Sequence, residues 1–388
     1  MNLGVYIQVP FCQTKCTYCN FHTGVVSSAR FAPYVDAVCR EIRGHRALHE
    51  AAGLHSALAV DEARVDTVYI GGGTPSLFEP ALLDRTLDAV RSSFHCDFAE
   101  VTLEADPETI EAGKAAAWRA SGINRISFGV QSFNDKELAA AGRMHRRADI
   151  FRAVPILRSA GIENISFDLI AGLPHQTKES WSESVRELVS LEPRHVSVYL
   201  LEIDEGSRLG REVLQRGKRY SAAELPSEDH MADFYETAQT VLRQAGYEHY
   251  EISNWAKPGF ASRHNLKYWR REPYLGFGAG AHSFSGRVRW ANAHDPAQYV
   301  AAIAAGRLPA EQQETVSEEQ ALDEELFLGL RQLAGVDLGR IEQQYGVSLA
   351  GRIAPLAKSG LLEQEGSVIR LAPSRLSVSN EVFVELLH

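Results

Sequence analysis

The sequence predicts an α/β fold, and three observations lead to that prediction. Short apolar segments of strand length recur between residues 4 and 201, and most are followed by a longer segment with helical spacing. The strand segments are rich in Val and Ile, which is typical of parallel strands buried on both faces. The chain has 388 residues, of which 45% are hydrophobic and 23% charged, so it can bury a sizeable core. The alternation alone leaves a βα barrel and a doubly wound sheet open.

The predicted elements follow one another in a regular order. Gly122 and Gly161 stand directly before two of the strands and are expected to cap the helices that precede them. The predicted strands are Gly4–Val9, Thr67–Ile70, Val101–Ala105, Arg125–Val130, Ile165–Ile170 and Val196–Leu201. The predicted helices between them are Ala32–Leu48, Pro80–Ser92, Glu108–Ala120, Asp149–Ala160 and Lys178–Leu191.

The regular alternation ends after Leu201. We expect a polar loop over residues 204–226, a helix over Glu228–Ala245 and a strand over Tyr247–Ile252. A boundary near residue 300 gives two domains, residues 1–300 and 301–388. The second domain is predicted to be mostly helical and to end in a hairpin around Gly366, an order of elements that resembles a winged helix.

The charge balance argues against a nucleic-acid partner. The formal net charge is −10, and residues 310–388 hold 6 Lys and Arg against 13 Asp and Glu. Nucleic-acid binding relies on Lys and Arg to neutralise phosphates, so this acidic domain is not expected to bind DNA or RNA. We expect it to serve as a packing or gating domain, or to dock on a membrane or an acceptor protein. No run reaches the roughly 18 consecutive apolar residues of a membrane helix, and no secretory signal is present. We therefore expect a cytoplasmic protein.

The strongest local signal is a group of three cysteines after the first predicted strand. Cys12, Cys16 and Cys19 have the spacing C-x3-C-x2-C, and their thiolates favour zinc, copper(I) or an iron–sulfur cluster. His22 could complete a tetrahedral zinc site. A cubane cluster held by only three cysteines would instead keep one iron open for a chelating ligand. Cys39 and Cys96 are isolated and are expected to be ordinary thiols.

This loop, with an aromatic residue before its third cysteine, resembles the radical S-adenosylmethionine (SAM) superfamily. The segments YIQVPFC and TYCNF resemble its oxygen-independent coproporphyrinogen III oxidase group. The resemblance implies a [4Fe-4S] cluster, SAM, and an electron donor such as a flavodoxin or ferredoxin. It also implies an incomplete TIM-like (βα)6 barrel with a mainly helical, winged-helix-like C-terminal domain. In such barrels the chemistry lies at the carboxyl ends of the strands.

The same resemblance implies a set of SAM-binding residues in order along the βα units. The GGGTP segment that begins at Gly71 is expected to contact the methionine part of SAM, although a triple glycine alone predicts only a tight turn. The Glu104 carboxylate could accept hydrogen bonds from the SAM ammonium or ribose, or simply begin a helix. The implied SAM residues are Tyr6, Tyr18, Gly72, Gly73, Thr74, Glu104, Gln131, Arg143 and Asp168.

A second motif lies near residue 264. Residues 264–269 read HNLKYW, which resembles the HNxxYW signature of the HemW haem chaperones within this group. That resemblance implies haem b as a ligand and haem-accepting proteins, some of them membrane-associated, as partners. His264 is a candidate axial ligand beside Tyr268 and Trp269, and His282 is a second candidate. The alternative is that His264 hydrogen-bonds a neighbour and the aromatic rings pack.

Two departures separate the chain from the oxidase itself. Phe21 stands where the oxidase has a fourth cysteine, and the oxidase also carries an extension ahead of its cluster strand. We therefore expect a haem chaperone, and we keep two alternatives. One is decarboxylation of coproporphyrinogen III propionates by a 5′-deoxyadenosyl radical, and the other is a haem-modifying radical SAM enzyme.

Overall fold

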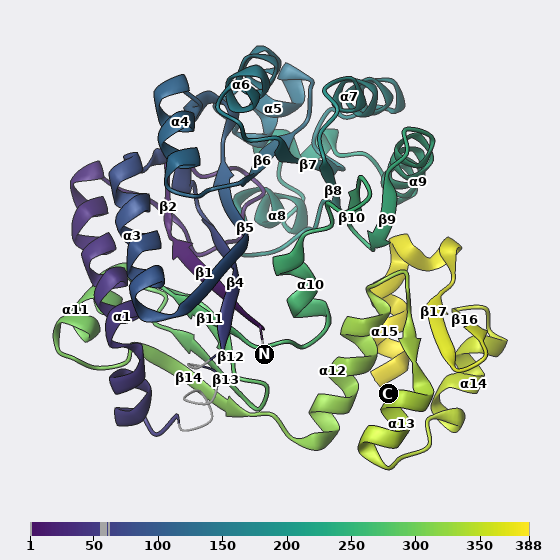
Figure 1. The fold of residues 1–388 in the computed structure, drawn as a ribbon. Helices are drawn as coiled ribbons and strands as arrows, with labels where there is room; N and C mark the ends of the chain where they lie inside the picture. The colour runs from purple at the N-terminus through teal and green to yellow at the C-terminus, as the bar shows by residue number, and fades with distance from the viewer. Residues whose placement is uncertain (1, 55–59, 61–62, 388) are drawn as a thin grey trace.

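The protein is built around one large, mostly parallel sheet (Figure 1). The computed structural model describes residues 2–54, 60 and 63–387. Six strands pair in parallel in chain order, as the predicted incomplete barrel requires. They are β1 (Asn2–Val9), β4 (Arg64–Gly72), β5 (His95–Ala105), β6 (Arg125–Gln131), β7 (Asn164–Ala171) and β8 (His195–Leu200).

Helices cover the outer face of these strands (Figure 1). Trp118 on α4 and Trp181 on α7 are fully buried, and they fill the layer beneath the helices. The covering helices are α1 (Phe31–Ala51), α3 (Pro80–Ser93), α4 (Ala112–Ala120), α5 (Asp135–Ala141), α6 (Arg147–Ser159), α7 (Lys178–Ser190) and α9 (Glu228–Gln244). Within the described part of the chain, no helix combines the length and apolar character needed to cross a bilayer.

Further strands extend the sheet at both edges. Beside β1 lies β11 (Tyr274–Phe277), which is parallel to it, followed by the antiparallel strands β12 (His282–Phe284), β13 (Val288–Asn292) and β14 (Ala310–Thr315). Beside β8 lie β10 (Asn254–Ala256) and β9 (Glu248–Glu251). A separate small sheet pairs β2 (Phe11–Cys12) with β3 (Gly24–Val25).

The division between the domains follows from these edge strands. Helix α11 (Pro296–Ala304) spans the predicted boundary at 300 and packs on α1. Strand β14 then pairs with β13 and so belongs to the large sheet. We propose that the division lies between residues 315 and 316.

The predicted loop over residues 204–226 is wrong in part. It contains α8 (Arg208–Leu214) and a 3-10 segment, η4 (Arg219–Glu224). Ser207 begins α8 because its side chain accepts a hydrogen bond from the Gly210 amide, and Leu209 is buried beneath the helix. A seven-residue helix in a polar sequence has too few apolar positions to show a helical period.

The C-terminal domain is mainly helical, as predicted, and its helices surround a three-stranded sheet whose strand β15 (Val336–Asp337) was not predicted. Its last two strands form the predicted hairpin. Its elements are α12 (Glu318–Leu330), β15 (Val336–Asp337), α13 (Leu338–Tyr345), α14 (Ala350–Lys358), β16 (Leu362–Glu365), β17 (Val368–Leu371), η5 (Pro373–Val378) and α15 (Ser379–Leu387). The domain docks on the strand edge at β9, where the Leu333 amide donates to the Tyr250 carbonyl at 3.1 Å.

Candidate cluster and cofactor site

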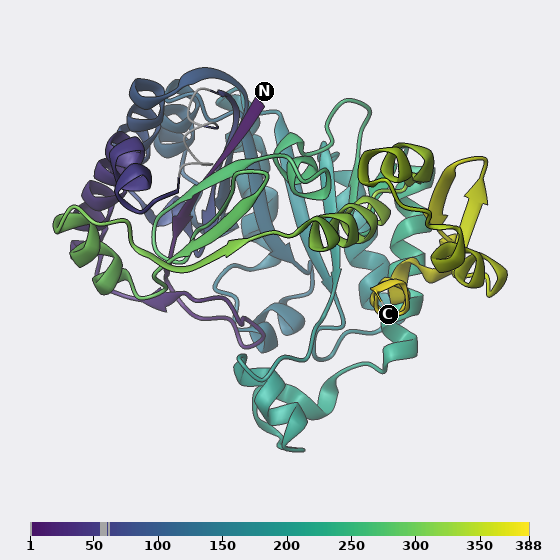
Figure 2. The same ribbon diagram turned by 90° about the horizontal axis from the view of Figure 1, so that it is seen from below.

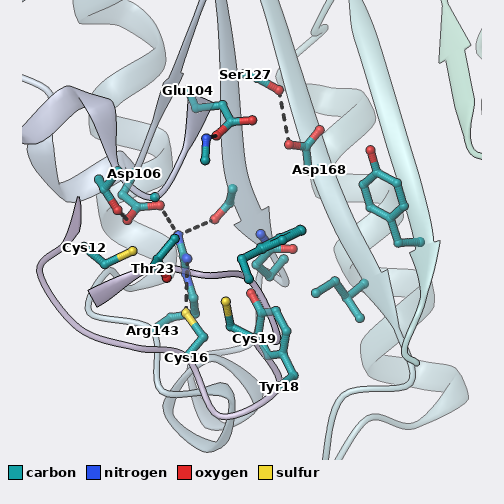
Figure 3. A pocket seen from close by; sticks show the side chains of 18 of the residues that line it. Cys12, Cys16, Tyr18, Cys19, Thr23, Glu104, Asp106, Ser127, Arg143 and Asp168 are labelled. Carbon is teal, nitrogen blue, oxygen red and sulfur yellow. Dashed lines mark hydrogen bonds and ion pairs between the residues drawn. The ribbon is translucent and has the colours of Figure 1, made fainter. Parts of the chain in front are cut away.

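A cavity of about 420 Å³ opens at the carboxyl ends of the parallel strands. The loop after β1 forms one wall (Figure 3). Residues of β4 to β8 and of the segments that follow them form most of the rest, together with Asn265. All three predicted cluster ligands, Cys12, Cys16 and Cys19, line it. The predicted SAM residues that line it are Tyr18, Gly72, Gly73, Thr74, Glu104, Gln131, Arg143 and Asp168.

Backbone hydrogen bonds hold the cysteine loop against the barrel. The Thr17 amide donates to the Ala141 carbonyl at 2.9 Å, and the Cys19 amide donates to the Cys16 carbonyl at 3.3 Å. Burial raises the pKa of the Cys12 and Cys19 thiols. A cationic cluster iron would reverse that effect, because metal binding requires and stabilises the thiolate.

The glycine segment after β4 is fitted to the cysteine loop. The Gly73 amide donates to the Val9 carbonyl at 2.7 Å, and the Thr74 amide donates to the Phe11 carbonyl at 2.8 Å. A Cβ atom on Gly73 would collide with the backbone of Phe11, and Gly72 has a φ of +111°. The glycines therefore let one strand end approach the loop that carries the cysteines.

Glu104 is a buried carboxyl group in the wall of this cavity. It accepts hydrogen bonds from the Tyr69 hydroxyl at 2.9 Å and from the Gly72 amide at 2.8 Å. Burial raises the pKa of Glu104 to about 7, although these two hydrogen bonds lower it. A cationic ligand in the cavity would favour the ionised form.

Arg143 links the cysteine loop to the acidic wall (Figure 3). Its guanidinium donates to the Cys16 sulfur at 3.4 Å, to the Gly129 carbonyl at 2.8 Å, and to the Asp106 carboxylate. Asp106 also accepts from the Thr74 hydroxyl at 3.2 Å. The cation is thus placed where it can stabilise negative charge on a cysteine sulfur.

Deeper in the barrel, Asp168 accepts from the Ser127 hydroxyl at 3.1 Å, and burial raises the pKa of Asp168. Gln131 lines the cavity and has a φ of +65°, a backbone conformation that a non-glycine residue rarely adopts. These strained and buried polar groups are typical of a functional site.

The expected SAM role of Tyr6 is not supported by its position. Tyr6 is outside the set of residues that line the cavity; its ring stacks on Tyr69 at 5.9 Å between centroids, and its hydroxyl donates to Gln8. Tyr69 occupies the wall instead. We did not anticipate Tyr69, Asp106, Arg125 or Ser127 as lining residues. For Tyr69, Arg125 and Ser127 the signal was inward-facing alternation along a strand, whereas Asp106 directly follows β5.

The HNxxYW segment closes the amino-terminal end of the barrel, and its Asn265 lines the cavity from that end. It forms helix α10 (Arg263–Trp269), and His264 is buried there. The Nδ1 atom of His264 lies 2.9 Å from the Thr67 hydroxyl, and Nε2 lies 2.9 Å from the Tyr268 hydroxyl. Burial lowers the pKa of His264 to about 3, so its ring is neutral. Both ring nitrogens have partners, which counts against the predicted haem-ligand role of His264.

Tyr268 and Trp269 also have packing partners at this end. The Tyr268 ring meets Tyr274 edge to face at 4.7 Å, and the Arg331 guanidinium lies 4.4 Å from the centre of Trp269. Arg331 belongs to the stretch that follows α12. Trp269 therefore joins the barrel to the C-terminal domain, whereas Tyr268 packs within the barrel, and both side chains are half-buried.

The three cysteines line one cavity without meeting at a single point. Across residues 2–54, 60 and 63–387, no three His, Cys, Asp or Glu side chains approach closely enough to hold one metal ion. A cubane binds each thiolate through a different iron, so its ligands surround it without meeting at a point. His22, the candidate fourth zinc ligand, instead contacts the His294 ring. Cys39 and Cys96 lie away from the cavity, as expected.

Comparisons with known proteins agree with this geometry. The Radical SAM superfamily profile matches residues 6–188, and the HemN C-terminal domain profile matches residues 316–374. A Bacillus subtilis protein named Heme chaperone HemW is 35% identical and covers 98% of both chains. A HemW of Synechocystis is 37% identical over 93% of this chain and 85% of its own.

A solved structure shows the same fold throughout. It is the Escherichia coli coproporphyrinogen III oxidase HemN, described as a radical SAM enzyme, and it superposes with a TM-score of 0.83. The identity is 25%, and the match covers 99% of this chain and 89% of that one. The cavity with its three thiols, the shared fold and the full-length identity lead to one conclusion. The chain belongs to the radical SAM superfamily and, within it, to the HemW family.

Proposed function

We propose that this protein is a haem chaperone that holds a [4Fe-4S] cluster and SAM in the barrel cavity, binds haem b and delivers it to acceptor haemoproteins. Relatives named as heme chaperones match along the whole chain. The observation that carries the proposal is the apolar rim of the cavity. Phe21, Met144 and Tyr199 line it and are 66%, 52% and 43% exposed. Exposed apolar side chains around a pocket favour a flat, apolar ligand.

The chain's own residues suit the proposed cofactors. Cys12, Cys16 and Cys19 would hold three irons of the cluster, which supplies an electron to the SAM sulfonium when it is reduced. Arg143 donates to the Cys16 sulfur and so tunes that ligand. The Glu104 carboxylate is placed to accept hydrogen bonds from a cationic amino group in the cavity.

A haem transfer assay tests the proposal. The reconstituted protein is loaded with haem under anaerobic conditions and mixed with a candidate apo-haemoprotein, with and without SAM and reductant. We expect stoichiometric haem binding, seen as a Soret shift, followed by transfer to the acceptor. The chaperone role is excluded if the acceptor takes up haem from the loaded protein no faster than it takes up free haem.

Coproporphyrinogen III oxidation is the second candidate, because the solved oxidase shares the fold over 99% of this chain. Phe21 argues against it, since the oxidase has a fourth cysteine at that position. Incubation of the reduced protein with coproporphyrinogen III and SAM distinguishes the two. Formation of protoporphyrinogen would establish the oxidase activity and overturn our main proposal.

The proposal includes a cellular setting. The thiols and the cluster require a reducing compartment, so we place the protein in the cytoplasm. An electron donor such as a flavodoxin or ferredoxin would reduce the cluster, and the acceptors would include membrane-associated haemoproteins. The acidic C-terminal domain makes nucleic acid an unsuitable partner.

A further inference from the structure

We propose that His22, supported by His294, provides the axial ligand for haem iron on the outer side of the cysteine loop. This inference rests on the proposed haem chaperone function and names the residue through which it would operate. It also assigns the haem to a place other than the HNxxYW helix.

His22 is free to bind a ligand from solvent. It is exposed and lies three residues after Cys19, beside the exposed Phe21. His22 is outside the set of residues that line the cavity, whereas its neighbours Phe21 and Thr23 belong to it. A ligand on His22 would therefore lie at the rim, next to the cluster chamber and outside it.

His294 fixes the ring of His22 from a second segment of the chain. The two imidazole centroids are 4.2 Å apart, with an angle of 34° between the planes. In Figure 2 the purple cysteine loop passes beside the green segment between β13 and α11, where His294 lies. A ring held in this way loses less conformational entropy when it binds a metal.

Hydrogen bonds hold the backbone next to His294, and one ring nitrogen of His294 keeps its bonding capacity free among the described residues. The preceding residue, Ala293, donates to the Pro309 carbonyl at 2.6 Å and accepts from the Gly280 amide at 2.9 Å. The Nδ1 atom of His294 is buried and has no hydrogen-bond partner in the described part of the chain. A Cβ atom on Gly280 would lie 3.0 Å from that nitrogen, so glycine leaves room for the ring.

The surroundings suit a porphyrin. Phe21 and Val25 are 66% and 60% exposed, and they flank His22 in sequence on the same loop. A third histidine, the exposed His282, lies on β12 near His294; burial and then the His294 charge lower the pKa of His282. An imidazole beside apolar side chains is an environment in which proteins ligate haem iron.

Haem titration of the full-length protein, with its cluster reconstituted, tests the inference. Haem b is added in the ferric state, and binding is followed by the Soret band and by the electron paramagnetic resonance of the haem iron. We expect His22→Ala to weaken haem binding by at least about tenfold and to remove the imidazole-ligated signal. The matched control is His95→Ala, an exposed histidine at the start of β5, which we expect to bind like the parent.

Two further variants separate ligation from mere support. His22→Gly with added imidazole should regain the ligated signal, because the free base can occupy the vacated position. His294→Ala should weaken binding, whereas His294→Phe, which preserves a ring against His22, should restore most of it. Cluster content measured on each variant shows whether the loop still folds.

The outcomes are distinguishable. If the parent protein binds no haem, the proposed function fails together with this inference. If the parent binds haem and His22→Ala retains both the affinity and the imidazole signal, the chaperone function stands and the inference is overturned. Equal weakening by His95→Ala would reveal adventitious binding by surface histidines, and would also overturn it.

Discussion

The two ends of the barrel contain similar side chains and use them in opposite ways. At the closed end, α10 places His264, Tyr268 and Lys267 inside the strands, and each has a partner within hydrogen-bond or ion-pair distance. At the open end, the three thiols, Glu104 and the Phe21 ring line a cavity or face solvent. Satisfied buried polar groups stabilise a fold, whereas groups with spare bonding capacity bind ligands.

The closed end depends on a helix whose first turn is capped by a buried carboxylate. Glu100 accepts from the backbone amides of Arg263 and His264 and from the Ser262 hydroxyl. An anion at a helix N-terminus is favourable because the first amides have no partners within the helix. We therefore propose that the HNxxYW motif, the most distinctive one in the second half of the sequence, closes this end of the barrel as a structural element.

The largest expected effect is at the open end. Cys16→Ser should abolish assembly of the [4Fe-4S] cluster, because serine oxygen is a poor ligand for its iron. Anaerobic reconstitution followed by iron analysis and paramagnetic resonance measures this. Cys96→Ser, at a half-buried thiol remote from the cavity, is the control and should load the cluster normally. Normal cluster content in Cys16→Ser would contradict the ligand assignment.

The closed end should respond in stability and leave ligand binding unchanged. His264→Ala removes partners from the Thr67 and Tyr268 hydroxyls and opens a cavity, so we expect a loss of about 3 kcal/mol in the free energy of unfolding. Urea denaturation of the apoprotein measures it. Haem affinity of the folded variant should equal that of the parent; a tenfold loss would move the haem ligand back to α10.

A smaller effect is expected where the glycine segment meets the cysteine loop. Gly73→Ala would place a methyl group against the Phe11 backbone and cost about 2 kcal/mol, with reduced cluster loading. Gly113→Ala is the control: Gly113 is exposed on α4 and its added Cβ would meet nothing within 4 Å, so we expect a gain of about 1 kcal/mol in the free energy of unfolding. Thermal unfolding of both variants measures these changes. If Gly73→Ala and Gly113→Ala were equally stable, the cysteine loop would be able to move away from the added methyl group without cost.

The smallest effect is a pH dependence of SAM binding. Glu104 must be ionised to attract the SAM ammonium, and burial raises its pKa to about 7. The affinity of the cluster-loaded protein for SAM should therefore be full above that pH and fall as the pH drops below it. Glu104→Gln should lower the affinity about tenfold at pH 8 and flatten the profile. Isothermal titration across pH 6 to 8 measures both.

Glu108 supplies the control for this titration. Burial also raises the pKa of Glu108 to about 7, and Glu108 lines the same cavity, but it lies 3.6 Å from His145. Glu108→Gln should keep the pH dependence. A flat profile in Glu108→Gln together with a steep one in Glu104→Gln would reverse the assignment.

The apolar pattern was enough to predict the α/β class and its six parallel strands, and the family resemblance supplied the barrel. Buried parallel strands such as Arg125–Gln131 carry continuous apolar runs, and this pattern is local. The gathering of Cys12, Cys16 and Cys19 was predictable because side chains on one short loop lie together whatever the fold does elsewhere, and all three line the cavity. The family resemblance singled out Glu104 and Asp168, and both line the cavity because parallel strands present their carboxyl ends at one edge.

Features that depend on distant partners were harder to predict. Tyr6 and His264 contact Tyr69, Thr67 and Tyr268, and no local pattern reveals those contacts. The pairing of β14 with β13 joins residues on either side of α11, and for this reason we propose a boundary later than residue 300. The contact between His22 and His294 likewise joins two segments far apart in the chain.

The central claim is that three sulfurs on one loop hold a cubane whose remaining iron is open to SAM. Paramagnetic resonance of the reduced, reconstituted protein tests it most directly, using SAM labelled with a magnetic nucleus in its amino group. We predict a [4Fe-4S] signal that changes when SAM is added and shows coupling to the labelled nitrogen. A cluster signal that SAM leaves unchanged, or one coupled to a fourth protein side chain, would contradict the account.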